Sequence, residues 1–126
     1  HDVDNTYTWS TDVGGTTPNG TAFTDFLLKL NGVGDSVTLT GCFAGHCDWR
    51  LPTIVELQTI LLAPYMCGTS PCIAPILGPT VASYHHSATT FAALPGSVWY
   101  VNFDRGSVGF GNKSTSSYVR AVRAGL

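Results

Sequence analysis

Near the middle of the chain the sequence reads Asp48-Trp49-Arg50-Leu51-Pro52-Thr53, with Glu56 three positions after Thr53. This spacing is that of a capping box, in which the two side chains accept hydrogen bonds from each other's backbone N–H at the start of a helix. Apolar residues then recur at helical spacing, at positions 54, 57, 60 and 61. The stretch therefore predicts a helix over residues 53–62, which Pro64 keeps from continuing.

The residues just before this helix combine a carboxylate, an indole and a guanidinium, a set that could suggest a catalytic trio. A guanidinium can satisfy backbone carbonyls or a carboxylate, and an indole supplies a large apolar surface. We therefore expect Asp48, Trp49 and Arg50 to form a buried structural brace, with Glu56 as a helix cap.

The remaining chain alternates between helical and strand-like patterns. Apolar residues at 22, 23, 26, 27 and 30 predict a helix over residues 19–30. Four prolines from Pro64 to Pro79 predict an ordered loop. Beyond this loop the pattern predicts a three-stranded antiparallel meander built from 98–103, 107–110 and 118–122. The N-terminal segment 7–9 should return beside the last strand, which describes an α+β domain.

The strand-like segments also carry large or charged side chains that need partners. Trp9 and Trp99 should pack under the helices as core residues. An unpaired buried guanidinium is costly, so Arg120 and Arg123 should pair with acidic residues such as Glu56 or Asp48.

Further blocks of the sequence extend the argument to nearly the whole chain. Near the end, Trp99-Tyr100-Val101-Asn102-Phe103 is followed by Gly106, Lys113 and Tyr118-Val119-Arg120-Ala121-Val122-Arg123. Together with the central stretch, these blocks resemble the DUF1566 family, also called the C-terminal domain of the Legionella collagen-like adhesin. The segments 4–9 and 26–31 look like the opening strand and the end of the first helix of that family.

The resemblance implies a specific architecture. It implies a C-type lectin-like α+β fold, with two helices packed on a small twisted antiparallel sheet and with long ordered loops. A chain of 126 residues fits one domain with one core. We therefore expect a single domain over residues 1–126.

Composition limits the partners that the domain could have. Charged residues make up 11% of the chain and the net charge is -2, so a basic surface for nucleic acid is not expected. Apolar runs are far shorter than the roughly 20 residues that cross a bilayer, so no membrane span is expected. The sequence shows no leader, which we interpret as a mature chain or a fragment.

Four cysteines, in the pairs Cys42/Cys47 and Cys67/Cys72, allow three disulfide pairings. A four-thiolate zinc site with His46 as a spare ligand is the competing interpretation, although structural zinc usually takes more closely spaced ligands. The resemblance implies an oxidising, extracytoplasmic location in a Gram-negative bacterium, whether secreted, periplasmic or at the cell surface. It therefore favours the two local bridges.

The segment Ser83-Tyr84-His85-His86-Ser87 departs from the family, which usually reads Tyr-Trp-Ser-Ser-Thr there. Adjacent histidines in a strand point to opposite faces, so they are not expected to bind one metal together. They either face a ligand or fill the space of the missing tryptophan. The following segment 88–96 looks like an exposed apolar loop and is the first candidate binding surface. The full set of candidate ligand-binding residues is Tyr84, His85, His86, Thr89, Phe91, Tyr100, Arg105 and Lys113.

A cofactor is not expected. The calcium-binding triplets of sugar-binding C-type lectins, Glu-Pro-Asn or Gln-Pro-Asp with a later Trp-Asn-Asp, do not occur in this sequence. Calcium needs clustered oxygen ligands, and only the acidic cluster at residues 2–5 and the pair Asn102 and Asp104 offer weak candidates.

The leading functional hypothesis is a non-catalytic, extracytoplasmic module that recognises a glycan or a protein on a surface. The family resemblance implies sulfated polysaccharides, but six Lys and Arg residues are few for such a polymer unless they converge on one face, with Arg105, Lys113, Arg120 and Arg123 as the candidates.

Two alternatives belong to other classes. The first is a structural subunit or cap of a larger extracellular assembly or homo-oligomer, docking through Phe91, Leu94, Tyr100 and Phe110. The second is an enzyme related to the formylglycine-generating oxidases, which share the broader fold. Catalysis is not expected, because the cysteines lie in early loops and the sequence suggests no Ser-His-Asp or paired-carboxylate arrangement.

Overall fold

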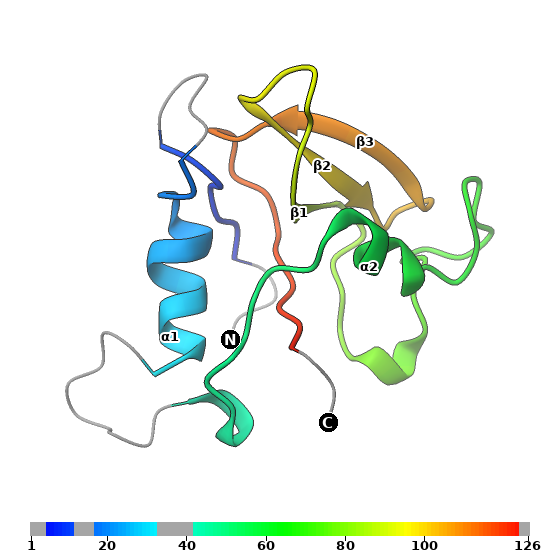
Figure 1. The fold of residues 1–126 in the computed structure, drawn as a ribbon. Coiled ribbons are helices and arrows are strands. Elements are labelled where there is room, and N and C mark those ends of the chain that lie inside the picture. The colour runs from blue at the N-terminus through cyan, green and yellow to red at the C-terminus, as the bar shows by residue number, and fades with distance from the viewer. Residues whose placement is uncertain (1–4, 12–16, 33–41, 124–126) are drawn as a thin grey trace.

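The computed structural model of the chain describes residues 5–11, 17–32 and 42–123 (Figure 1). Its helical elements are η1 (Ala22–Leu27), α1 (Leu28–Leu30), η2 (Phe43–Gly45), α2 (Ile54–Thr59) and η3 (Pro75–Leu77). The strands β1 (Tyr84–Thr90), β2 (Ser97–Asn102) and β3 (Ser107–Asn112) form one antiparallel sheet in the order β1-β2-β3. The described chain is therefore a mixed α+β structure with few helices and a small sheet.

The hairpin of β2 and β3 confirms two of the predicted strands. The chain reverses at Gly106, whose φ of 82° is unfavourable for a residue with a Cβ. A Cβ at this position would also lie 3.0 Å from the carbonyl oxygen of Ala63. The turn thus requires glycine for its backbone conformation and for close packing against the loop after α2.

The third strand of the sheet is not the one that the sequence predicted. The segment 118–122 makes only isolated bridges and does not pair with β3, whereas β1 joins the sheet on the other edge of β2. The meander prediction was wrong because β1 reads Tyr-His-His-Ser-Ala-Thr-Thr, which lacks the apolar alternation of a half-buried strand. Part of the predicted loop 88–96 therefore belongs to the sheet, and only 91–96 connects β1 to β2.

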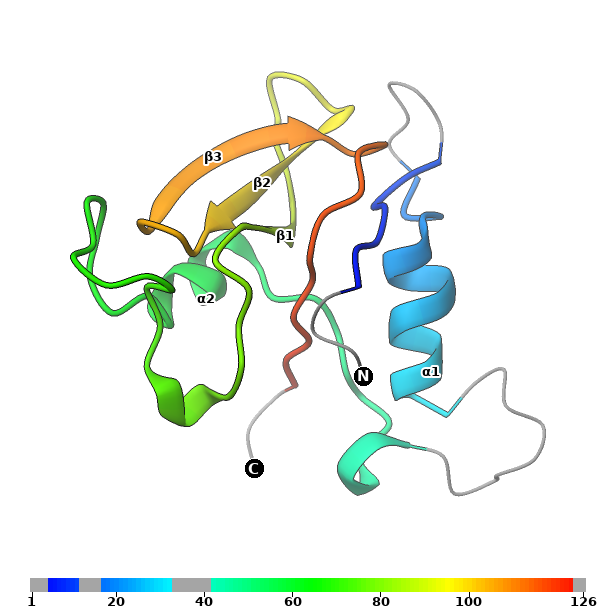
Figure 2. The same ribbon diagram turned by 180° about the vertical axis from the view of Figure 1, so that it is seen from behind.

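The C-terminal segment runs through the centre of the molecule, between α1 on one side and the sheet with α2 on the other (Figures 1 and 2). Ser117 pairs with Tyr7, Tyr118 lies parallel to His85, and Val122 pairs with Arg50. The prediction that the N-terminal segment returns beside the end of the chain is thus confirmed.

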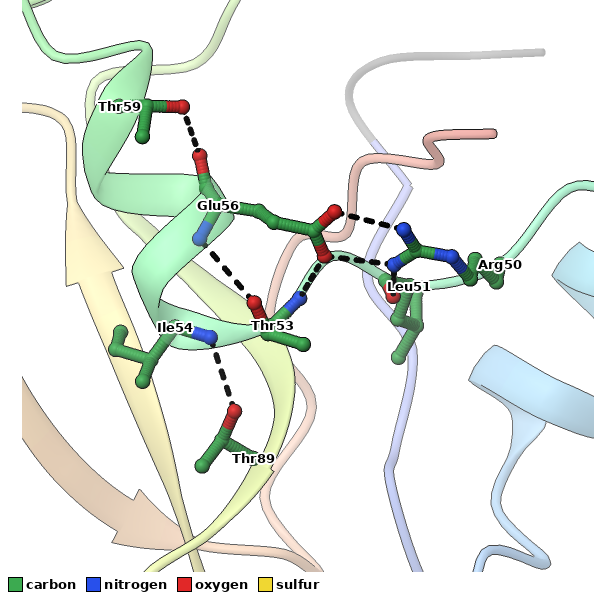
Figure 3. A network of polar contacts seen from close by, with 7 residues as sticks. All are labelled: Arg50, Leu51, Thr53, Ile54, Glu56, Thr59 and Thr89. Carbon is green, nitrogen blue, oxygen red and sulfur yellow. Dashed lines mark hydrogen bonds and ion pairs between the residues drawn. The ribbon is translucent and has the colours of Figure 1, made fainter. Parts of the chain in front are cut away.

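Both predicted helices exist, with shifted ends. The first begins at Ala22 as a π-helical stretch and continues without a break through α1 to Leu30. The second is shorter than the predicted 53–62, because Leu61 leaves the helix to pair with Ile73. Its start is as predicted: Thr53 Oγ1 accepts from the Glu56 N–H at 3.2 Å, and Glu56 Oε1 accepts from the Thr53 N–H at 2.9 Å (Figure 3).

Two groups of buried residues form the core. One lies around the first helix and contains Trp9, Ala22, Phe26, Leu30, Leu51 and Val98. The other lies between α2 and the sheet and contains Leu57, Ile73, Val101 and Phe103. Trp9 packs against Phe23 of the first helix as expected, but Trp99 packs against Phe91 and Phe110 instead of a helix.

The cysteines form the two local disulfides, Cys42–Cys47 and Cys67–Cys72. All four sulfurs are used in these bonds, so the alternative four-thiolate zinc site does not form. Cys67 and Cys72 are buried, whereas Cys42 and Cys47 lie nearer the surface. Over the described ranges, none of the helices has the length and apolar character required to span a membrane.

Candidate functional site

The two histidines of β1 are buried within the fold. The exposed fractions of His85 and His86 are 4% and 2%. Tyr118 pairs with β1 along the edge opposite β2, so the strand is enclosed on both edges. His85 lies edge-on to Phe103, and the His86 ring contacts the Thr115 carbonyl at 3.1 Å through Nε2.

Burial also sets the charge of these rings. Burial lowers the pKa of His85 to about 4, and the positive charge of Arg120 contributes a smaller lowering. Burial also lowers the pKa of His86. Both imidazoles are therefore neutral at pH 7. His85 Nδ1 lies 3.0 Å from the Ser83 carbonyl, which can only accept, so Nδ1 carries the proton and Nε2 is an acceptor.

The residues around the central stretch form a brace, but it lies at the surface. Arg50 forms two 2.7 Å contacts with the Glu56 carboxylate (Figure 3). These bonds, with that from the Thr53 N–H, lower the pKa of Glu56 to about 2. The Arg50 and Glu56 side chains remain 47% and 41% exposed, so the expected burial is wrong. The charged groups keep contact with water while the helix cap still forms.

The two C-terminal arginines behave differently from each other. Arg123 Nε lies 3.0 Å from Asp48 Oδ1, which confirms one of the expected pairs. Arg120 pairs with neither expected acid. Its Nη1 donates to Thr80 Oγ1 at 2.9 Å and its Nη2 donates to the Leu77 carbonyl.

Of the other candidate ligand-binding residues, two are engaged inside the fold. Thr89 Oγ1 accepts from the Ile54 N–H at 2.9 Å and so supports the start of α2 (Figure 3). Lys113 is 1% exposed, with its amine 3.9 Å from the centre of the Trp9 ring. It is therefore buried and not available to a ligand at the surface.

The remaining candidates stay accessible at least in part. Tyr84 is 46% exposed and lies edge-on to Tyr100 at 4.7 Å. Phe91 stacks on Phe110 with ring centres 4.0 Å apart. Arg105 is exposed in the turn between β2 and β3.

A pocket of about 290 Å³, the aromatic pocket, lies where the N-terminal segment, the first helix and the C-terminal segment meet. Aromatic and aliphatic side chains form most of its wall: Tyr7, Phe26, Leu30, Phe43, Trp49, Leu77, Val81 and Val119. His85 and Arg120 supply an imidazole and a guanidinium to the wall. Of the ligand-binding residues predicted from sequence, only His85 contributes to this pocket.

Trp49 is held firmly in the pocket wall. The Asn31 side-chain amide accepts from the Trp49 N–H at 2.8 Å and donates to the Trp49 carbonyl at 3.0 Å. The Trp49 indole N–H donates to the Phe43 carbonyl at 3.0 Å, and the two rings pack edge to face. In the sequence, Asn31 belonged only to the segment 26–31 that looks like the end of the first helix, so sequence reasoning missed its role.

A second hollow, of about 510 Å³, lies beside the end of α2 and the β2–β3 turn. Gln58, Leu62, Tyr65 and Val108 contribute to its wall, and none of the described residues that line it is charged. It therefore offers fewer charged and hydrogen-bonding side chains for orienting a ligand than the aromatic pocket.

In the described part of the chain, no group of three or more His, Cys, Asp and Glu residues is placed to hold a metal ion. Asp104 accepts instead from the Ser70 hydroxyl at 2.7 Å.

Comparisons with known proteins give one match. No curated protein and no solved structure matches the chain. A family model described as the Lcl C-terminal domain matches residues 1–123. This family is one of extracellular, adhesin-related modules, and the two disulfides are consistent with that location. The matched residues include the central stretch and the C-terminal blocks, so the chain belongs to the Lcl C-terminal domain family.

Proposed function

We propose that this domain is a non-catalytic, extracytoplasmic recognition module with a C-type lectin-like architecture, which binds a group displayed by a glycan or protein on a surface. The observation that carries the proposal is the aromatic pocket with its single guanidinium. Ligand sites are typically concave and mostly apolar, with a few polar groups that fix orientation. A pocket of about 290 Å³ suits a single sugar ring or amino-acid side chain better than a long polymer.

The pocket wall is organised before any ligand arrives. Asn31 fixes both backbone polar groups of Trp49, and the pairing of Tyr7 with Ser117 holds the N-terminal side of the wall. A wall that is already ordered loses little conformational entropy on binding, which favours affinity. This arrangement suits recognition better than a reaction, because the described pocket wall includes no Ser, Cys, Asp or Glu.

The proposal is tested by filling the pocket. Val81 contributes to the wall, so Val81→Phe should occupy much of its volume. Val55 is 68% exposed on α2 and lies outside the pocket wall, so Val55→Phe is the matched control. Both variants are compared with the parent on a glycan array and on intact cells treated with glycosidase or protease. Each scan is run with and without calcium, which also tests for a dependence on this ion.

The expected result is binding by the parent and by Val55→Phe, with a loss of at least about tenfold in Val81→Phe at an unchanged urea midpoint. The treatment that abolishes cell binding identifies the ligand as glycan or protein. Parental affinity in Val81→Phe would contradict a role for the pocket. A folded domain that binds neither the array nor cells would contradict the recognition function itself.

A second candidate function, a docking subunit of a larger assembly, is favoured by a specific apolar surface. Phe91, Trp99 and Phe110 pack together on the sheet, and Phe110 remains 45% exposed. Leu94 in the adjoining loop is 53% exposed. Light scattering on the parent and on Phe110→Ser tests this candidate. A concentration-dependent oligomer that becomes monomeric in the variant would support it, and a monomeric parent would contradict self-assembly.

A further inference from the structure

Arg120 places a positive charge in the pocket without a matching negative charge in the described part of the chain. The three described ion pairs use other cations, Lys29, Arg50 and Arg123. Arg120 is partly buried, and burial lowers its pKa, although an arginine stays charged at every physiological pH. A partly desolvated charge is stabilised by an opposite charge, so the site favours an anion.

The guanidinium is held in place and still has donors to offer. Thr80 and the Leu77 carbonyl each accept one hydrogen bond from it, so two N–H groups are engaged. A guanidinium carries five N–H donors in a planar fork, and the remaining donors have no described protein partner. A planar fork matches the two oxygens of a carboxylate in a bidentate geometry.

The rest of the wall defines what the anion must be attached to. Tyr7, Phe26, Phe43, Trp49 and Val119 present apolar surface to the pocket. A small inorganic anion would leave this surface exposed to water, whereas an organic acid with an apolar body would cover it.

We infer that the pocket binds a carboxylate carried on an apolar or aromatic group, with Arg120 pairing the carboxylate and the aromatic wall covering the apolar body. The inference deepens the proposed recognition function and rests on it. Two sources share this chemistry: a small free carboxylic acid and the C-terminal residue of a peptide chain. The neutral His85 adds an acceptor for an N–H or O–H of the ligand, which a C-terminal residue can supply through its amide.

The test compares acids with their uncharged amides on the unmodified protein. Phenylacetate and phenylacetamide represent the free acid. A tetrapeptide ending in phenylalanine, with a free or an amidated C-terminus, represents the chain end. Titrations are followed by two-dimensional NMR of backbone amides and of the arginine Nε–H groups. The expected result is movement of the Val81, Val119 and Arg120 signals, with each acid binding at least about tenfold more tightly than its amide.

The two acids distinguish the sources, since tighter binding of the peptide acid would identify a chain end and tighter binding of phenylacetate a free acid. Arg120→Lys keeps a charge without the planar fork, and Arg120→Met removes the charge. Acid binding should weaken in the first and approach amide binding in the second. A parental urea midpoint in each variant shows that its loss of acid binding is not an effect on folding.

Three results would overturn the inference. The first is equal binding of acid and amide in the pocket, which would leave the recognition function standing. The second is the absence of any movement of the NMR signals from the pocket residues. If Val81→Phe also left binding to the glycan array and to cells unchanged, the proposed function of the pocket would fail too. The third is acid binding at parental strength in Arg120→Met, because the guanidinium would then not be what holds the carboxylate.

Discussion

Lys113 provides the most discriminating test of how this domain is held together. The sequence placed it among the ligand-binding candidates, yet its side chain is 1% exposed. Its amine donates to Thr90 Oγ1 at 2.8 Å and lies 3.9 Å from the centre of the Trp9 ring. Burial lowers the pKa of Lys113, as expected for an ammonium removed from water. We therefore predict that the apolar stem of Lys113, and not its charge, supports the fold.

The magnitude follows from what each substitution removes. Lys113→Ala deletes three methylene groups beyond Cβ, worth about 2.4 kcal/mol at ~0.8 kcal/mol each. The cavity left under Trp9 raises the expected loss to about 3 to 4 kcal/mol. Lys113→Met keeps most of the stem. It removes one hydrogen bond and a cation–π contact, worth roughly 1 kcal/mol each, but it also removes the desolvation cost of the ammonium. We expect Lys113→Met to stay within about 1 kcal/mol of the parent.

The assay is equilibrium unfolding in urea at pH 7 without reductant, followed by circular dichroism. Thr90→Val serves as a matched variant, because it leaves the buried amine without its hydrogen-bond acceptor and should cost about 1 to 3 kcal/mol. In the Lys113→Met background the same Thr90→Val change should be nearly neutral. A loss in Lys113→Met as large as that in Lys113→Ala would refute the reasoning, because the charge itself would then be what stabilises the fold.

Three further predictions concern the helix cap, the histidines and the disulfides. Thr53→Ala should lower the free energy of unfolding by about 1 kcal/mol and Thr53→Ser by only a few tenths, as measured in urea; equal losses would contradict the capping role. His85 has a folded pKa of about 4 against an ordinary value of 6.5, and His86 is shifted in the same direction. The unfolded chain therefore takes up protons at a higher pH than the folded chain, so the free energy of unfolding should fall as pH drops from 6.5 toward 4. In His86→Gln the free energy of unfolding should change less steeply with pH. An unchanged dependence on pH would contradict a buried neutral His86. Replacing Cys67 and Cys72 by alanine should lower the free energy of unfolding by about 2 to 5 kcal/mol. It should also lower the melting temperature more than the same replacement at Cys42 and Cys47, which lie nearer the surface. The reverse order would show that burial does not determine how much a disulfide stabilises this fold.

The parts of the structure that could be predicted from the sequence are those determined by neighbouring residues. The Thr53 cap depends on a residue three positions away, and the β2–β3 hairpin depends on a glycine that can take the positive φ of its turn. The local disulfides join cysteines five positions apart. For the cap and the hairpin the partner is close in sequence, so pattern and spacing carry the information. For the cysteines, spacing left three pairings open, and the family resemblance favoured the local ones.

The polar strand β1 shows where this reasoning stops. Its histidines look like surface residues, and a strand of this composition offers no apolar face to recognise. Its histidines can be buried because each imidazole reaches one backbone carbonyl, that of the neighbouring Ser83 for His85 and that of the distant Thr115 for His86. The Ser87 hydroxyl likewise donates to the Trp99 carbonyl at 2.7 Å.

The candidate site shows the same limit more clearly. The amino-acid sequence was sufficient to predict the family, the α+β class, the helix cap and the hairpin, because these depend on local order and composition. Only the tertiary structure decided that Arg120 lacks the acid expected for it and lies instead beside His85, in a pocket that also includes Trp49. These residues are separated by long stretches of chain, and their meeting depends on how the C-terminal segment passes between the first helix and the sheet. Long-range packing of this kind leaves no periodic signal in the sequence, so both the pocket and its unmatched charge emerge only from the folded chain.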